Sequence, residues 1–519
     1  MQFLADTFAV ASPERTLKSD ISVRELLDHA RSELDKNTTA DPKVRKPVQR
    51  MIGRLYFSLD DRRGAAELLS AGTRDVQPRD RSEALALADD LVVQSLAFDS
   101  LEQLPETLAA ADRAVALRRQ FAPDDPEQQL RSLANITLAH VQKFGLPACR
   151  KQADEALALA RRMPNPPVDV VLHVYSLAGD GARFADDRAR LLQASDEGLA
   201  FADQRGVPAG SPLRVNLLRN RGEGMVMQGR YPQAEVAARQ AIAIADATGS
   251  SGETRTGILY GVLSKALLGQ GRYREALSAH EDSVRFMPAV NLGPRNIAVS
   301  LGNQSMLYYA VGDYAKGLAL CRQAIAGLDK AYIGAGDDFR TPVEVKCARQ
   351  LLAAGQLAKA DAMLQPLLAR VGKADGEDSE NYALVLSAMV ESAQLAGDPV
   401  RGQKLLDDAR IRYTHRGLPP AHVRFAQFLR ADAAFARMRG DLASAERKQR
   451  EALAMLLSLG NPFDVAAARA ELGRIRSERG DDAQARTLLA EALPVMRASV
   501  LPQQSDRATA EALARKLGV

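Results

Sequence analysis

The sequence predicts an all-α superhelical solenoid, and three observations lead to this fold class. The 519 residues are dominated by alanine, leucine and arginine, include no tryptophan and are only 5% aromatic, a composition that favours helices over strands. One short phrase recurs: a glycine, an apolar or aromatic residue two positions later, then a small residue three further on. Its glycines recur at a nearly constant interval of about 42 residues, which is typical of stacked repeats. These glycines are Gly229, Gly271, Gly312, Gly355, Gly397, Gly440 and Gly480.

Each phrase is expected to form the turn of a helical hairpin. The glycine supplies the positive φ that ends the first helix, the aromatic residue packs the turn, and the small residue lets the second helix approach. In the unit of Gly229 these positions are Tyr231 and Ala234, and apolar residues at helical spacing lie on both sides. A hairpin of this size cannot bury its own apolar face, so neighbouring hairpins must stack on one another.

Stepping back by about 42 residues from Gly229 reaches Gly145 and the Asp60–Asp61 turn, whereas the units near Glu102 and Asp187 fit the pattern less well. About eleven hairpins with terminal capping helices therefore fill the chain. Ser22 and Glu25 form a capping box at the first helix, and Ser505–Asp506 is expected to cap a last helix over 507–517. The expected divisions are an N-terminal segment with a capping helix (1–41), more degenerate repeats (42–250), clearer repeats (251–504) and a capping helix (505–519).

Several function classes are disfavoured by composition and by motifs. Sixty-nine basic and 65 acidic residues leave a net charge of only +4, so nucleic acid is not an expected partner. No kinase loop, Walker A motif, HExxH or GxSxG occurs, and the six histidines are scattered, so no catalytic residue, metal or cofactor is expected. The three cysteines, Cys149, Cys321 and Cys347, show no metal spacing and are expected to be small buried residues without a disulfide framework. No targeting segment or membrane-spanning stretch is visible.

The repeat phrase resembles the tetratricopeptide repeat (TPR), which places glycine, tyrosine and alanine at such offsets. Gly222, Gly229, Tyr231, Ala234 and Ala241 follow that pattern closely in one unit. The period of about 42 residues departs from the usual 34 and is similar to a long-helix variant with extended connectors. This resemblance implies a protein-interaction module and says nothing about the ligand.

The opening of the chain resembles a second family. Phe3–Phe8, Ser12–Glu14, Ile21–Asp28 and Ile52–Tyr56 follow in the order seen where the membrane helix joins the TPR array of certain bacterial serine/threonine protein kinases. Lys18–Asp20 departs from the Gly-Arg pair usual there. The resemblance implies a non-catalytic sensor region, beginning just after a membrane helix. It implies a periplasmic part of an inner-membrane kinase, regulating that kinase and downstream signalling. The alternative is a free-standing cytoplasmic TPR adaptor or effector-responsive regulator.

Candidate binding residues follow from the expected curvature, because first helices line the concave side of such a solenoid. Counting back 10, 9, 6 and 3 positions from the turn glycines gives candidates among which basic and amide side chains predominate, and such groups hold peptide backbone or carboxylate groups well. We therefore expect a groove for an acidic or extended peptide, or for a protein or small ligand, and the sequence leaves a homodimer open. The candidates are Arg219, Asn220, Glu223, Lys265, Asn303, Lys346, Arg349, Arg430, Arg437 and Arg474.

Overall fold

The computed structural model describes residues 22–36, 41–142, 147–185, 187–249, 254–286, 293–330, 340–418 and 420–519. Within these ranges it contains 24 α-helices and no strand, which confirms the predicted fold class. The helices form eleven successive hairpins between two single helices, α3 (Val23–Lys36) and α26 (Ser505–Leu517). Gly145 and positions 1–21 lie outside the described ranges, so the turn expected at Gly145 and the motifs at Phe3–Phe8 and Ser12–Glu14 are not described. The kinase resemblance stays a prediction.

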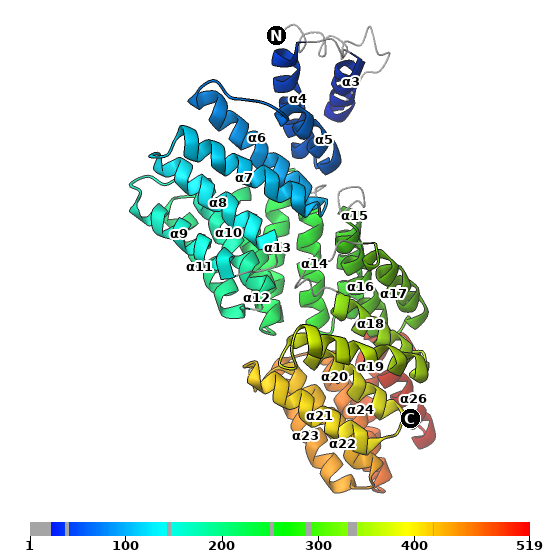
Figure 1. The fold of residues 1–519 in the computed structure, drawn as a ribbon. Coiled ribbons are helices and arrows are strands. Elements are labelled where there is room, and N and C mark those ends of the chain that lie inside the picture. Colours follow the sequence, from blue (N-terminus) through cyan, green and yellow to red (C-terminus); the bar gives the residue numbers. More distant parts are fainter. Residues whose placement is uncertain are drawn as a thin grey trace. The chain divides into compact units, whose positions relative to one another are not determined.

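The first six hairpins begin at residue 42. They are α4 (Pro42–Ser58) with α5 (Arg62–Thr73), α6 (Arg81–Ser100) with α7 (Leu104–Phe121), α8 (Pro126–Gln142) with α9 (Pro147–Arg162), α10 (Val168–Phe184) with α11 (Arg188–Gln204), α12 (Val215–Met227) with α13 (Tyr231–Ala247), and α14 (Thr254–Gly269) with α15 (Tyr273–Phe286). Figure 1 shows α6 to α11 lying side by side as stacked antiparallel pairs.

Five further hairpins complete the array. They are α16 (Pro294–Val311) with α17 (Tyr314–Leu328), α18 (Arg340–Ala353) with α19 (Leu357–Ala374), α20 (Glu380–Leu395) with α21 (Pro399–His415), α22 (Val423–Met438) with α23 (Leu442–Leu459), and α24 (Pro462–Glu478) with α25 (Asp482–Ser499). The chain forms two compact units. Unit 1 comprises Met1–Arg221, Ala241–Gly257 and Phe286–Gly293, and unit 2 comprises Gly222–Gln240, Ile258–Arg285 and Pro294–Val519.

The turns are built as the repeat phrase predicts. All seven turn glycines have positive φ, between +69° and +93°, and Asp60 takes the same conformation at +62°. In four hairpins the residue after the glycine is an aspartate that caps the second helix, as Asp441 does by accepting a hydrogen bond from the Ser444 amide at 3.0 Å. One Gly-Asp pair therefore ends the first helix and starts the second. These pairs are at 312–313, 397–398, 440–441 and 480–481.

The small residues of the phrase mark close approaches between helices. Ala234, Ala276 and Ala445 are fully buried. At Gly402 an added Cβ would lie 2.2 Å from the ring of Phe435 in the next hairpin's first helix, so only glycine fits. Residues of α20 and α21 therefore share one hydrophobic cluster with α22 of the next hairpin, as stacking of two-helix units requires.

The two ends of the described chain are capped by polar side chains. The Ser22–Glu25 capping box is confirmed, because the Ser22 amide donates to Glu25 Oε2 at 2.9 Å and the Glu25 amide donates to Ser22 Oγ at 3.1 Å. At the other end the cap prediction was wrong by one residue. Helix α26 begins at Ser505, and the capping side chain is Gln504, which accepts a hydrogen bond from the Arg507 amide at 3.0 Å.

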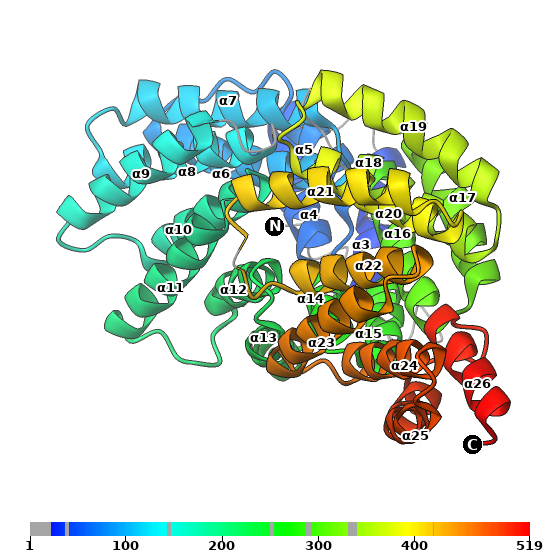
Figure 2. The same ribbon diagram turned by 90° about the horizontal axis from the view of Figure 1, so that it is seen from below.

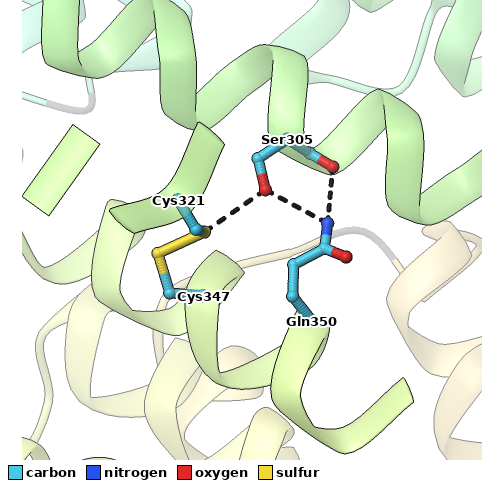
Figure 3. Close-up of a disulfide and its surroundings, with 4 residues drawn as sticks. All are labelled: Ser305, Cys321, Cys347 and Gln350. Carbon is cyan, nitrogen blue, oxygen red and sulfur yellow. Dashed lines mark hydrogen bonds between the residues drawn. A yellow bond between two sulfur atoms is a disulfide. The ribbon is translucent and has the colours of Figure 1, made fainter. Parts of the chain in front are cut away.

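The expectation that all three cysteines are free was also wrong. Cys321 in α17 and Cys347 in α18 form a disulfide with their Cα atoms 5.4 Å apart, which Figure 3 shows beside a buried polar cluster. In that cluster the Gln350 amide donates to the Ser305 carbonyl oxygen at 2.6 Å. Stacking of adjacent hairpins brings the two cysteines together across a sequence separation of 26. Cys149 is buried and free, as predicted, and burial raises the pKa of its thiol to about 11.

Unit 2 closes on itself, because its last hairpin and the capping helix α26 pack against α15 and α16 (Figure 2). The Asn461 side-chain amide before α24 donates to the Gly269 carbonyl oxygen at 3.2 Å, 192 residues away. The Leu501 amide donates to the Val311 carbonyl oxygen at 2.8 Å, and the Ser505 amide donates to the Tyr314 hydroxyl oxygen at 2.9 Å. Two hairpin turns of the unit's early repeats thus dock against its last hairpin and cap.

Closure of unit 2 requires glycine at position 312 for two reasons, and substitution of Gly312 therefore tests the closure. Gly312 has φ +93°, and an added Cβ would lie 2.8 Å from Gln504 Cβ, whereas Gly440 has φ +82° with no atom within 4 Å. We expect Gly440→Ala to cost about 1–2 kcal/mol for the left-handed backbone. Gly312→Ala should cost a further ~1–3 kcal/mol for the clash. Denaturant unfolding measures both, and equal losses would contradict closure at Gly312.

Candidate functional site

The first helices of unit 2 surround a pocket of about 330 Å³. Side chains from α16, α18, α20, α22 and α24 line it, together with Ser505 and Asp506 of the capping helix, which closure brings to its rim. Its wall is apolar at Leu352, Val390 and Phe428. A largely apolar hollow with a few polar groups is the usual form of a ligand site.

The polar groups of the pocket are amides and paired charges. Gln394 and Gln427 are exposed at its surface. Arg430 donates to Asp506 at 3.0 Å, which joins α22 to α26 across the pocket. Glu471 lies 3.2 Å from Arg437, and burial raises the pKa of Glu471 against the opposing influence of nearby arginines. The pocket therefore offers amide groups for hydrogen bonding, and its positive and negative side chains largely balance one another.

The predicted candidates of unit 2 mostly pair with an acidic or amide group one repeat away. Arg349 donates to Glu391 at 2.9 Å across 42 residues, and Glu391 lines the pocket. Arg437 reaches Glu478 at 3.1 Å, and Arg474 lies 3.4 Å from the same carboxylate. Of the ten candidates only Arg430 lines the pocket itself. Lys265 pairs with Glu223 at 2.8 Å, and Lys346 donates to Asn303 at 2.6 Å.

Two candidates belong to unit 1, and each forms a hydrogen bond to the neighbouring hairpin there. Arg219 donates to Asp180 at 2.8 Å, and the fully buried Asn220 donates to the Ser176 carbonyl oxygen at 2.8 Å. Both partners lie in α10, the preceding first helix. These side chains join hairpins to each other, so their polarity is explained by packing between repeats.

Several residues that line the pocket were not among the predicted candidates, although counting back 10, 9, 6 and 3 positions from the turn glycines reaches some of them. Applied to Gly397, the same count gives Ser387, Glu391 and Gln394, and all three line the pocket. Applied to Gly312 and Gly355 it gives Tyr309 and Leu352, an aromatic and an apolar residue, whereas the candidates were all charged or amide side chains. No repeat offset predicts Ser505 or Asp506, because they reach the pocket through closure of the unit.

Comparison with known proteins agrees with this architecture. Residues 213–289 match the tetratricopeptide repeat family. No curated protein matches the chain. NprR in complex with its cognate peptide NprX is similar in structure, with a TM-score of 0.50, 11% identity, and coverage of 71% of this chain and 99% of NprR.

Two further solved structures have lower scores. A Rap protein complexed with competence and sporulation factor has a TM-score of 0.48 at 10% identity, covering 76% of this chain and 99% of that one. BtubC from P. vanneervenii has a TM-score of 0.37 at 17% identity, covering 44% of this chain and 94% of that one. The likeness to NprR and the repeat match define the class of fold, a TPR-type helical repeat protein suited to protein interaction.

Lys346 on α18 should make stability depend on pH. Burial, with Lys265 and Arg349 nearby, lowers the pKa of Lys346 from 10.5 to about 8. Between pH 8 and 10.5 the unfolded chain therefore binds more protons than the folded one, and the free energy of unfolding from this group rises with pH. We expect Lys346→Met to lose that rise in unfolding titrations, while Lys359→Met, at an exposed site on α19, keeps it. Identical profiles for the two variants would contradict the burial of a charged Lys346.

Proposed function

We propose that the chain is a non-catalytic binding module whose unit 2 recognises a short extended peptide. The observation that carries the proposal is the pocket on the first helices, with an apolar wall beside exposed amides. Amides can accept and donate hydrogen bonds with peptide backbone, and the wall suits one apolar side chain. Of the two arginines in the pocket, Arg430 is paired with Asp506 and Arg424 donates to Gln427 Oε1 at 3.3 Å. Since three carboxylates line the same pocket, it favours an extended peptide over a strongly acidic one. NprR, solved with its cognate peptide, is an example of a similar fold that holds a peptide.

A selection experiment tests peptide binding. The chain has no tryptophan, so Leu395→Trp at the pocket, where Leu395 is 60% exposed, creates a local fluorescence reporter. Peptides selected from a random phage-displayed library should shift this emission. They should leave Ile411→Trp on α21, 51% exposed and outside the pocket, unchanged.

Placing a bulky charged side chain in the pocket provides a second test of peptide binding. Ala431→Arg should weaken binding of a selected peptide at least about tenfold, by loss of apolar contact and occupation of the space. Val400→Arg, at an exposed position of α21, is the matched control and should bind as the parent does. Selected peptides that bind all variants equally would reject the pocket as the site.

We further propose that this module is the periplasmic sensor region of a membrane-anchored bacterial serine/threonine kinase and regulates that kinase. The order of motifs between Phe3 and Tyr56 supports the kinase link. The Cys321–Cys347 disulfide supports an oxidising compartment, where such bonds persist. Among the described residues no helix is both long and apolar enough to cross a membrane.

The disulfide gives a direct test of the compartment. Cells are first quenched in acid, and the chain is then denatured and alkylated. One thiol, that of Cys149, should react without reduction, and three thiols should react after reduction. Mass spectrometry counts the alkyl groups. Three thiols without reduction would instead favour the cytoplasmic adaptor, and a full-length gene without an upstream kinase domain would reject the kinase link.

A further inference from the structure

Unit 1 contains a second pocket, separate from the proposed peptide site. It has a volume of about 420 Å³ and lies against the end of α7, the first half of α8 and the second half of α9. Figure 1 shows these three helices side by side. This volume is within the range of pockets that hold small molecules.

A buried arginine with unused donors lines this pocket. Arg118 is 2% exposed, and its side chain makes one hydrogen bond to the described residues, from Nη2 to Asp89 at 2.6 Å. Its Nε and Nη1 atoms are buried without an acceptor among those residues. Buried donors without acceptors are uncommon in folded proteins, because each loses its hydrogen bonds to water and gains none in return. Neither atom is accessible to solvent as the side chain stands, so an anion in the pocket would pair with them after a turn of the guanidinium toward the pocket.

The remaining lining gives the pocket two chemically different parts. Arg119 and Arg162 add positive charge on α7 and α9, against one carboxylate, Glu155. Leu133, Ile136 and Leu159 are half-buried and supply an apolar surface beside them. A guanidinium fork is suited to a carboxylate, and the apolar surface suits a hydrocarbon body attached to it.

From these observations we propose that this pocket binds a small amphiphilic carboxylate, its head group on Arg118 and its apolar body on α8 and α9. A ligand of this kind satisfies the buried donors and covers the half-buried aliphatic side chains at once. An inorganic anion does only the first, and a neutral apolar molecule only the second. The proposal does not depend on peptide binding by unit 2, and either can fail alone.

Isothermal titration of the whole chain with octanoate tests the assignment. Octanoate should bind at least about tenfold more tightly than octanamide, which lacks the charge, and than inorganic phosphate, which lacks the apolar body. An acetylated hexapeptide ending in leucine separates a small molecule from a peptide C-terminus. Equal binding of octanoate and octanamide, or tighter binding of the hexapeptide, would overturn the proposal, as would no octanoate binding.

Variants locate the binding in the pocket. Arg118→Met should weaken octanoate binding at least about tenfold. Because that change also removes the contact with Asp89, Ile136→Trp is the second variant, which fills the pocket and keeps the Arg118–Asp89 pair. Arg150→Gln on α9, at an exposed arginine outside the pocket, should bind octanoate as the parent does. Folded Arg118→Met and Ile136→Trp proteins with unchanged affinity would place the ligand elsewhere and reject the site.

Discussion

The structure of unit 2 depends on its closure, in which the last hairpin and the capping helix pack against the early repeats. Contacts between adjacent hairpins fix the curvature locally, but they leave the two ends of the coil independent. The hydrogen bond from the Leu501 amide to the Val311 carbonyl oxygen, and that from Asn461 to Gly269, join segments that are far apart in the sequence. Their consequence is chemical as well as geometric, since they bring Asp506 to Arg430 and give the pocket a wall from the capping helix.

Charged side chains on the first helices act mainly between repeats. Pairs such as Arg349 with Glu391 and Lys265 with Glu223 are separated by one repeat and recur along the unit. Partly buried pairs of this kind are costly to break, because the remaining partner keeps its desolvation penalty. The first helices of unit 2 are therefore rich in arginine without being strongly cationic, and the peptide recognition proposed there would rest on shape and amide groups. Arg118 in unit 1 differs from these paired side chains, because two of its buried nitrogens, Nε and Nη1, have no acceptor in the described part of the chain.

Much of the fold is predictable because the residues that form each helical hairpin lie within a single repeat. Glycine at a constant interval, followed by a capping aspartate and a small residue, specifies a turn and two helices without reference to the rest of the chain. Long-range pairing is not encoded in this way. Cys321 and Cys347 have no distinctive spacing, and only the stacking of α17 on α18 brings them together. The counting rule likewise reaches Glu391 and Gln394, whereas Asp506 joins the pocket through a contact that no periodicity describes.

Hydrogen exchange across 501–505 measures closure most directly. In this account the Leu501 and Ser505 amides are held by Val311 and Tyr314, so they should exchange as slowly as amides inside α24 and α25. The exposed loop at 376–378 provides the rapidly exchanging reference in the same unit. Exchange at 501 and 505 as fast as in that loop would contradict the closed coil, and with it the origin of the pocket.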